Sequence, residues 1–161
     1  MLVLSLCLAG ICGAEGGDAE RKKLLEQKKR LDDRIETLQR EQDYLLFQKT
    51  MYESDSKYLI INLSAKTGQF KYKNRLLKNL HFKLISGHVS RLTPGALTLT
   101  QKIEGPRERN LLVFGQSLVL QGKYAPATRV GSGIPRFSLS KKDFLSIYYA
   151  IESGAKAFIL L

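Results

Sequence analysis

Tryptophan is absent from the 161-residue sequence, and cysteine is nearly so. The two cysteines, Cys7 and Cys12, lie near the start, so residues 13–161 contain no thiol. This absence excludes a disulfide framework and a cysteine-bound metal from that part of the chain. The only two histidines, His81 and His88, are not grouped with acidic residues. We therefore expect neither a metal nor a cofactor.

Hydrophobic runs long enough to cross a membrane are also absent. The apolar segment at residues 2–12, LVLSLCLAGIC, is short of the roughly 20 residues that a spanning helix needs. Small residues follow it, so we predict a signal peptide over residues 1–14, cleaved near Ala14, and a location in the periplasm or elsewhere in the cell envelope. No Lys or Arg precedes the segment, which leaves a buried N-terminal helix or a lipid anchor as alternatives.

Acidic residues are scarce in residues 57–161, which contain 17 Lys and Arg against 4 Asp and Glu, a net charge of +13. Residues 15–56 contain 9 against 11, a net charge of −2. The basic part should attract polyanions such as nucleic acid, anionic lipid headgroups or wall polymers. An exported chain would not meet nucleic acid, and no basic motif interleaved with aromatics is present, so we expect no nucleic-acid partner. A merely soluble basic surface is the alternative.

Residues 19–54 contain no Gly or Pro, and this predicts one long helix. Large side chains recur every seven residues, with Ile35 at an intermediate position: Leu24, Leu31, Leu38, Leu45 and Tyr52. This spacing is typical of an amphipathic or coiled-coil helix that joins a second copy of the chain or packs on the chain's own domain. The other intermediate positions, Lys28, Gln42 and Lys49, would weaken a dimer seam.

Residues 57–161 show the alternation of apolar and polar residues that is typical of strands, at residues 58–63, 70–72, 80–84 and 97–100. Residues 111–114 and 118–120 flank Gly115 as in a hairpin, and residues 156–161 predict a last strand. Ser140 and Asp143 form a capping box before an apolar stripe, predicting a helix over residues 141–153 with Gly154 as its C-cap. The predicted fold class is α+β, with a long N-terminal helix and a mainly β domain.

The order of these features resembles the YkuD-type L,D-transpeptidase domain, which remodels peptidoglycan with a catalytic Cys. Residues 58–63 resemble the opening strand of that family, and Ser86-Gly87 followed by Thr93-Pro94-Gly95 resembles its SG…TPxG segment. Residues 118–122 correspond to its apolar strand ending in His-Gly. Leu139, Ser140 and Asp143 correspond to the end of its SHGCxRLSxxD motif. The resemblance covers residues 57–161 and implies a mainly β fold.

The catalytic positions of the resembled family hold other residues here. Counting back from Asp143, the Cys falls on Arg136, the Gly on Pro135, the His on Ile134 and the Arg on Ser138. In a second alignment Ser132, Gly133 and Arg136 match the motif and the Cys falls on Ile134. The first His of the family site is Gln121 in both alignments. Neither alignment supplies a thiol nucleophile.

We therefore expect a degenerate, non-catalytic domain that binds peptidoglycan or another anionic envelope polymer or partner. Arg136 is expected either to hold a carboxylate with its two-pronged guanidinium or to be an ordinary surface residue. Two other hypotheses stay open: an enzyme in which Ser132 or Ser138 acts with His88 or Lys141, and a coiled-coil scaffold. The candidate ligand-binding residues are His88, Gln121, Ser132, Arg136 and Ser138.

Overall fold

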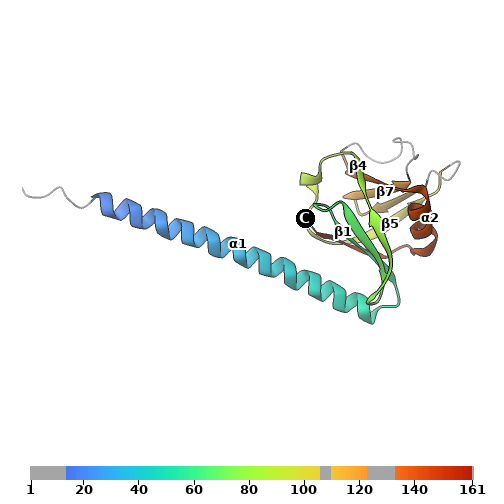
Figure 1. Ribbon diagram of the computed structural model, residues 1–161, viewed down its shortest axis with the longest axis horizontal. Helices are drawn as coiled ribbons and strands as arrows, with labels where there is room; N and C mark the ends of the chain where they lie inside the picture. The colour runs from blue at the N-terminus through green and yellow to red at the C-terminus, as the bar shows by residue number, and fades with distance from the viewer. Residues whose placement is uncertain (1–13, 106–109, 123–132, 161) are drawn as a thin grey trace, which may run out of the picture. The chain divides into compact units, whose positions relative to one another are not determined.

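The computed structural model describes residues 14–105, 110–122 and 133–160. A long helix, α1 (Ala14–Glu53), precedes a mainly β domain that contains one further α-helix, α2 (Lys141–Ala150) (Figure 1). The chain divides into two compact units, residues 1–39 and residues 40–161. The α+β class predicted from the sequence is confirmed. Neither α1 nor α2, as far as the structure describes them, combines the length and hydropathy of a membrane span.

Nine strands form one sheet in the described part of the domain. They are β1 (Lys57–Asn62), β2 (Thr67–Tyr72), β3 (Arg75–His81), β4 (Lys83–Ser86), β5 (Gly95–Ile103), β6 (Leu111–Phe114), β7 (Leu118–Gly122), β8 (Arg136–Leu139) and β9 (Lys156–Leu160). Their order is β3-β2-β1-β9-β5-β6-β7-β8-β4. The β1–β9 and β7–β8 pairs are parallel, and the others are antiparallel.

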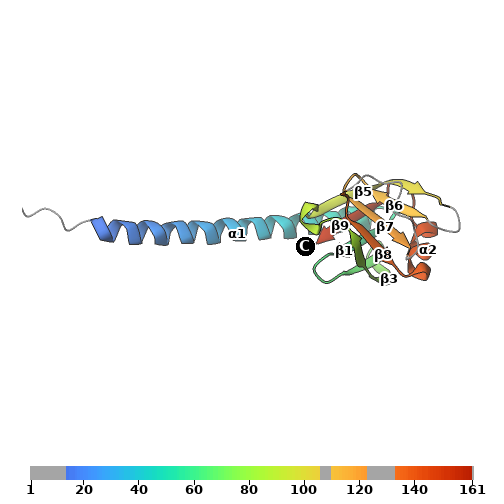
Figure 2. The same cartoon turned by 90° about the horizontal axis from the view of Figure 1, so that it is seen from above.

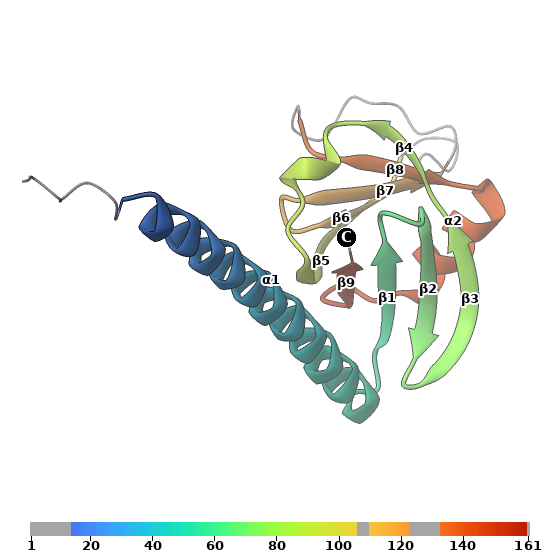
Figure 3. The ribbon, with the colours of Figure 1, turned by 60° about the vertical axis from the view of Figure 1, so that its left-hand side comes forward.

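The two edges of the sheet are joined directly, because only Phe82 separates β3 from β4. Phe82 is buried, and its backbone N–H donates to the Lys66 carbonyl at 2.9 Å. Figure 3 shows β4 on the β7–β8 side of the domain while β3 stays beside β2. The sheet therefore curves until it is nearly closed, and β4 brings the residues after β3 to β8.

Alternation along β7 and β8 divides their side chains between the two faces of the sheet. Leu118, Leu120, Phe137 and Leu139 belong to the main core, which the apolar face of α2 completes. α2 lies beside β7 (Figure 2). A Cβ added at Gly122, the last residue of β7, would lie 3.4 Å from the Phe144 ring. The other face of β6 and β7 carries a smaller apolar cluster of Leu111, Val113 and Val119.

Ser140 is the N-cap of α2, as the capping box predicted. The predicted end of this helix was wrong: α2 stops at Ala150, and the extended residue Ile151, not Gly154, is its C-cap. The backbone N–H of Ile151 donates to the Ile147 carbonyl at 2.8 Å, and its side chain is buried in the main core. Gly154, at φ +85, lies in the turn before β9.

The end of α1 docks on the β domain through aromatic contacts. Phe47 and Met51 are buried against Tyr58, Ile60 and Phe158. The Phe47 ring lies 5.6 Å from the Tyr58 ring and 5.0 Å from the Phe158 ring, between centroids. The heptad residues of the same helix segment remain exposed, Leu45 at 63% and Tyr52 at 57%. The helix therefore packs on its own domain through a different face from the one that the heptad spacing defines.

Candidate functional site

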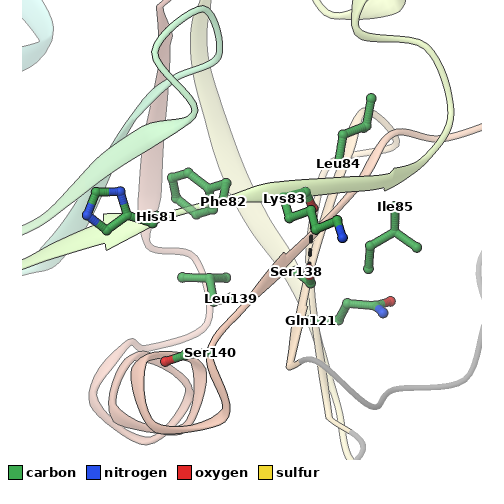
Figure 4. A pocket seen from close by; sticks show the side chains of 9 residues that line it. All are labelled: His81, Phe82, Lys83, Leu84, Ile85, Gln121, Ser138, Leu139 and Ser140. Carbon is green, nitrogen blue, oxygen red and sulfur yellow. Dashed lines mark hydrogen bonds between the residues drawn. The ribbon is translucent and has the colours of Figure 1, made fainter.

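A pocket of about 710 Å³ lies where β4 meets β8 and β7 (Figure 4). Its residues come from the end of β3, from β4, from the end of β7, and from β8 with the N-cap of α2. The lining residues are His81, Phe82, Lys83, Leu84, Ile85, Gln121, Ser138, Leu139 and Ser140. The pocket thus combines an apolar floor with an ammonium group, an imidazole, an amide and two hydroxyls.

The strand register brings the polar lining residues together. Gln121 on β7 is the parallel partner of Ser138 on β8, and Ser138 is the antiparallel partner of Lys83 on β4. The Ser138 hydroxyl donates to the Lys83 carbonyl at 3.4 Å, as the dashed line in Figure 4 shows. Because Phe137 and Leu139 face the core, Ser138 is the residue between them that is left for the pocket.

Ser140, the N-cap of α2, lines the pocket, and the start of this helix is held by a network of charged hydrogen bonds. The Ser140 hydroxyl accepts from the Asp143 backbone N–H at 3.1 Å and donates to its carboxylate at 2.7 Å. Lys78 on β3 pairs with the same carboxylate at 2.7 Å and donates to the Ser146 hydroxyl at 3.1 Å. The hydrogen bond from Lys78, assisted by the one from Ser140, lowers the pKa of Asp143 below its usual value of 3.8. Asp143 is therefore a charged helix cap.

Two of the predicted site residues, Gln121 and Ser138, meet in this pocket. Gln121 is only 4% exposed although it is polar. Arg136 begins β8, pairs with Ser86 and Val119, and is not among the described residues that line the pocket. It is 6% exposed, which corrects the expectation of an ordinary surface arginine. A guanidinium is rarely buried to this degree unless another group pairs with it, because removing a charge from water is costly.

The remaining predicted site residues lie elsewhere. Ile134 packs against the small apolar cluster of Leu111, Val113 and Val119. His88 is exposed and precedes a short 3-10 helix, Val89–Arg91, outside the described lining of the pocket. Lys141 is exposed at the first residue of α2, and Ser132 lies outside the described residues.

The Ser86-Gly87 segment lies against the chain that leads into β8. Gly87 has φ +84, and a Cβ added there would lie 2.7 Å from Pro135 Cα. A Cβ added at Gly133 would lie 2.6 Å from the Arg91 guanidinium. The Ser86-Gly87 segment and the chain before β8 are therefore close in space. Glycine is required at position 87 by the backbone contact and its positive φ, and at position 133 by its φ of +97.

Sequence reasoning overlooked His81 and Lys83. His81 is exposed, and it lines the pocket together with Lys83. Their place in the site depends on the pairing of β4 with β8, which joins residues about 50 positions apart in the chain. A local alternation pattern carries no signal of such a pairing.

The donor set suits an anionic or amide-bearing ligand. Lys83 supplies a point charge, and the hydroxyls and the Gln121 amide can donate and accept hydrogen bonds. Within residues 14–105, 110–122 and 133–160, no group of three His, Cys, Asp or Glu residues is arranged to hold a metal ion. An apolar pocket with a few convergent polar groups is the usual form of a binding site for an organic ligand.

No protein-family model and no curated protein matches this chain. Among solved structures, an L,D-transpeptidase from Mycobacterium smegmatis matches with a TM-score of 0.50 and 12% identity, over 66% of this chain and 59% of that one. An L,D-transpeptidase from Stackebrandtia nassauensis gives 0.49 at 15% identity over 66% and 56%, and one from Xylanimonas cellulosilytica gives 0.49 at 10% over 66% and 61%.

The Mycobacterium smegmatis likeness defines the fold of the β domain as L,D-transpeptidase-like, as the order of the sequence motifs predicted. At 12% identity the likeness concerns the fold alone. The chain spans about three fifths of the length of that structure.

Proposed function

We propose that this chain is an exported cell-envelope protein whose L,D-transpeptidase-like domain binds peptidoglycan, or another anionic wall polymer, without cleaving or joining it. The observation that carries the proposal is a polar pocket at the β4–β7–β8 junction of this fold, in a chain with no thiol after Cys12. A thiolate nucleophile is what the resembled family uses to form its acyl-enzyme. A guanidinium or an isoleucine at the matched positions cannot attack a carbonyl.

The hydroxyls of the pocket support binding rather than nucleophilic attack. Ser138 donates to the Lys83 carbonyl, which cannot take up its proton. Ser140 donates to the Asp143 carboxylate. Because a carboxylate can accept a proton, this hydrogen bond is the strongest argument for the alternative of a serine enzyme. The same carboxylate pairs with Lys78, however, and its lowered pKa makes it a poor general base.

The charge of the pocket fits a carboxylate-rich polymer. Lys83 is exposed on β4, and the domain around it has a net charge of +13. Long-range attraction would concentrate an anionic polymer at the domain, and the pocket would then hold a carboxylate or amide group by hydrogen bonds. Arg136 remains a candidate for supporting this site from within, because it is buried in the strand that ends at the pocket.

Co-sedimentation of the full chain with isolated sacculi tests the proposal. We expect Lys83→Ala to weaken binding about three- to tenfold, because one directed charged contact is lost. The matched control is Lys71→Ala on β2, which removes the same charge outside the pocket lining and should change binding much less. Equal losses for the two variants, or no binding at low salt, would refute a binding pocket.

The same samples separate binding from catalysis. The sacculi are digested afterwards and their muropeptides are compared by mass spectrometry with those of untreated sacculi. We expect no new cross-linked, exchanged or trimmed products. New products that persist after Cys7 and Cys12 are both replaced by Ser, and that disappear with Ser138→Ala or Ser140→Ala, would establish the serine-enzyme alternative instead.

A further inference from the structure

Helix α1 carries an exposed apolar stripe, here called the leucine stripe. It consists of the residues at seven-residue spacing together with Ile35, each of them 52–63% exposed: Leu24, Leu31, Ile35, Leu38, Leu45 and Tyr52. Leu25 and Leu46, at 61% and 54%, widen the stripe on one side. Such an apolar stripe on one helix, although Lys28, Gln42 and Lys49 interrupt it, is typical of a surface that pairs with another helix.

Within residues 40–53, the β domain leaves the stripe residues Leu45 and Tyr52 uncovered. In residues 40–53 the docking contacts come from Tyr44, Phe47 and Met51. In the heptad that places Leu45 and Tyr52 at position d, these three residues fall at positions c and f, opposite the seam. Docking on the domain and pairing through the leucine stripe can therefore occur together.

We infer that the leucine stripe binds a second copy of the chain, with the two α1 helices antiparallel and Ile35 of each copy facing Leu38 of the other. An unshifted parallel pair is disfavoured by charge, because Lys28 would face Lys28 and Lys49 would face Lys49 across the seam. In the antiparallel pair Lys28 faces Leu45 and Lys49 faces Leu24. Their aliphatic stems can cover these leucines while the ammonium groups reach water.

The flanking positions of this alignment are complementary as well. The wide side of the leucine stripe brings Leu25 of one copy against Leu46 of the other. The opposite flank brings Arg34 against Glu41. Each contact occurs twice because the pair has twofold symmetry. Neither Arg34 nor Glu41 has an opposite charge three or four positions away in the sequence, where a partner on its own helix would be.

Charge favours this antiparallel alignment over the two alignments that are shifted by one heptad. A shift by one heptad in one direction places Arg34 against Arg34 and Asp32 against Asp32. A shift in the other direction places Glu41 against Glu41. Like charges across a seam disfavour pairing, so both shifted forms lose stability where the central form gains it.

A charge swap tests the flanking contact in the full chain. Arg34→Glu and Glu41→Arg should each weaken dimerisation about tenfold in sedimentation equilibrium, because two attractive pairs become two repulsive ones. The double variant restores opposite charges and should return within about twofold of wild type. Lys23→Glu, the same kind of reversal outside the seam, is the control. A wild type that is monomeric at every concentration, or a double variant as weak as the single ones, overturns the proposal.

Cross-linking tests the direction of the helices. In a chain with Cys7→Ser and Cys12→Ser, Leu31→Cys and Gln42→Cys are prepared separately and treated with a short bismaleimide. The antiparallel pair places residue 31 of one copy against residue 42 of the other, so we expect cross-linked dimers only when the two variants are mixed. Self-cross-linking of each variant alone indicates a parallel pair and would overturn the inferred geometry.

Discussion

The Asp143 carboxylate accepts a hydrogen bond from Ser140, which lines the pocket, and it also contributes to the stability of the domain. Its pKa is held below 3.8, first by the hydrogen bond from Lys78, so the folded state binds its proton less readily than the unfolded state. The resulting stabilisation is present above about pH 4 and is lost as the pH falls through the lowered pKa. We expect Asp143→Asn to reduce the free energy of unfolding by about 1 kcal/mol at pH 7. Urea unfolding at several pH values measures this difference.

The difference between wild type and Asp143→Asn should shrink below pH 4, where the wild-type carboxyl is also protonated. Asp55→Asn is the control, since Asp55 pairs with Lys73 and also has a lowered pKa but its side chain is 86% exposed. Solvent screening should make the Asp55 effect much smaller. Equal effects at the two sites, or a difference for Asp143 that does not depend on pH, would contradict the assigned role.

For single residues, the sequence predicts contacts between near neighbours in the chain but not contacts between distant ones. The Ser140–Asp143 cap was predictable because its partners are three residues apart, and the structure confirms it. The pairing of Asp143 with Lys78 and the burial of Arg136 were not, because they depend on strands that meet only in the folded chain. Local spacing specifies local contacts, and the pocket is built from non-local ones.

At the scale of elements, the docking of α1 depends on Met51. This side chain is only 2% exposed, among Phe47, Tyr58, Ile60 and Phe158. We expect Met51→Ala to reduce the free energy of unfolding by about 2 to 4 kcal/mol, because it leaves a cavity between the helix and the sheet. Urea unfolding followed by circular dichroism measures this. At a concentration where the chain is monomeric, Tyr52→Ala, on the face that the domain leaves exposed, should cost far less. Similar losses for both would show that the helix docks through another face.

Elements were predictable where their pairing is local. The β6–β7 hairpin was predicted from two apolar runs around Gly115, and the structure confirms it. The parallel pairs β1–β9 and β7–β8 join segments that are separated by 13 or more residues, and no pattern in the sequence indicates them. The docking face of α1 was also missed, because the seven-residue spacing of leucines gives a stronger pattern than Phe47 and Met51.

At the scale of the whole molecule, charge is distributed unevenly along the chain. Residues 57–161 carry +13 and residues 15–56 carry −2. The fold brings the basic residues of the C-terminal part onto one compact domain, which is the part with the L,D-transpeptidase-like fold. The slightly acidic part is the helix that we expect to pair with a second copy. Attraction to an anionic polymer and self-association therefore belong to different parts of the chain and can be measured separately.

Binding of the full chain to isolated sacculi should accordingly depend on salt. The screening length falls from about 10 Å at 0.1 M salt to about 3 Å at 1 M, so attraction by the net charge of +13 on residues 57–161 is strong at the first concentration and largely lost at the second. We expect the bound fraction to fall steeply across this range for wild type, measured by co-sedimentation. Arg34→Glu, which weakens helix pairing, should lose its binding at a lower salt concentration than Lys23→Glu, which makes the same change in charge outside the seam, because a dimer binds a polymer at two points and a monomer at one. Binding that stays constant up to 1 M salt would mean that uncharged contacts hold the polymer, and would contradict the role assigned to the basic domain.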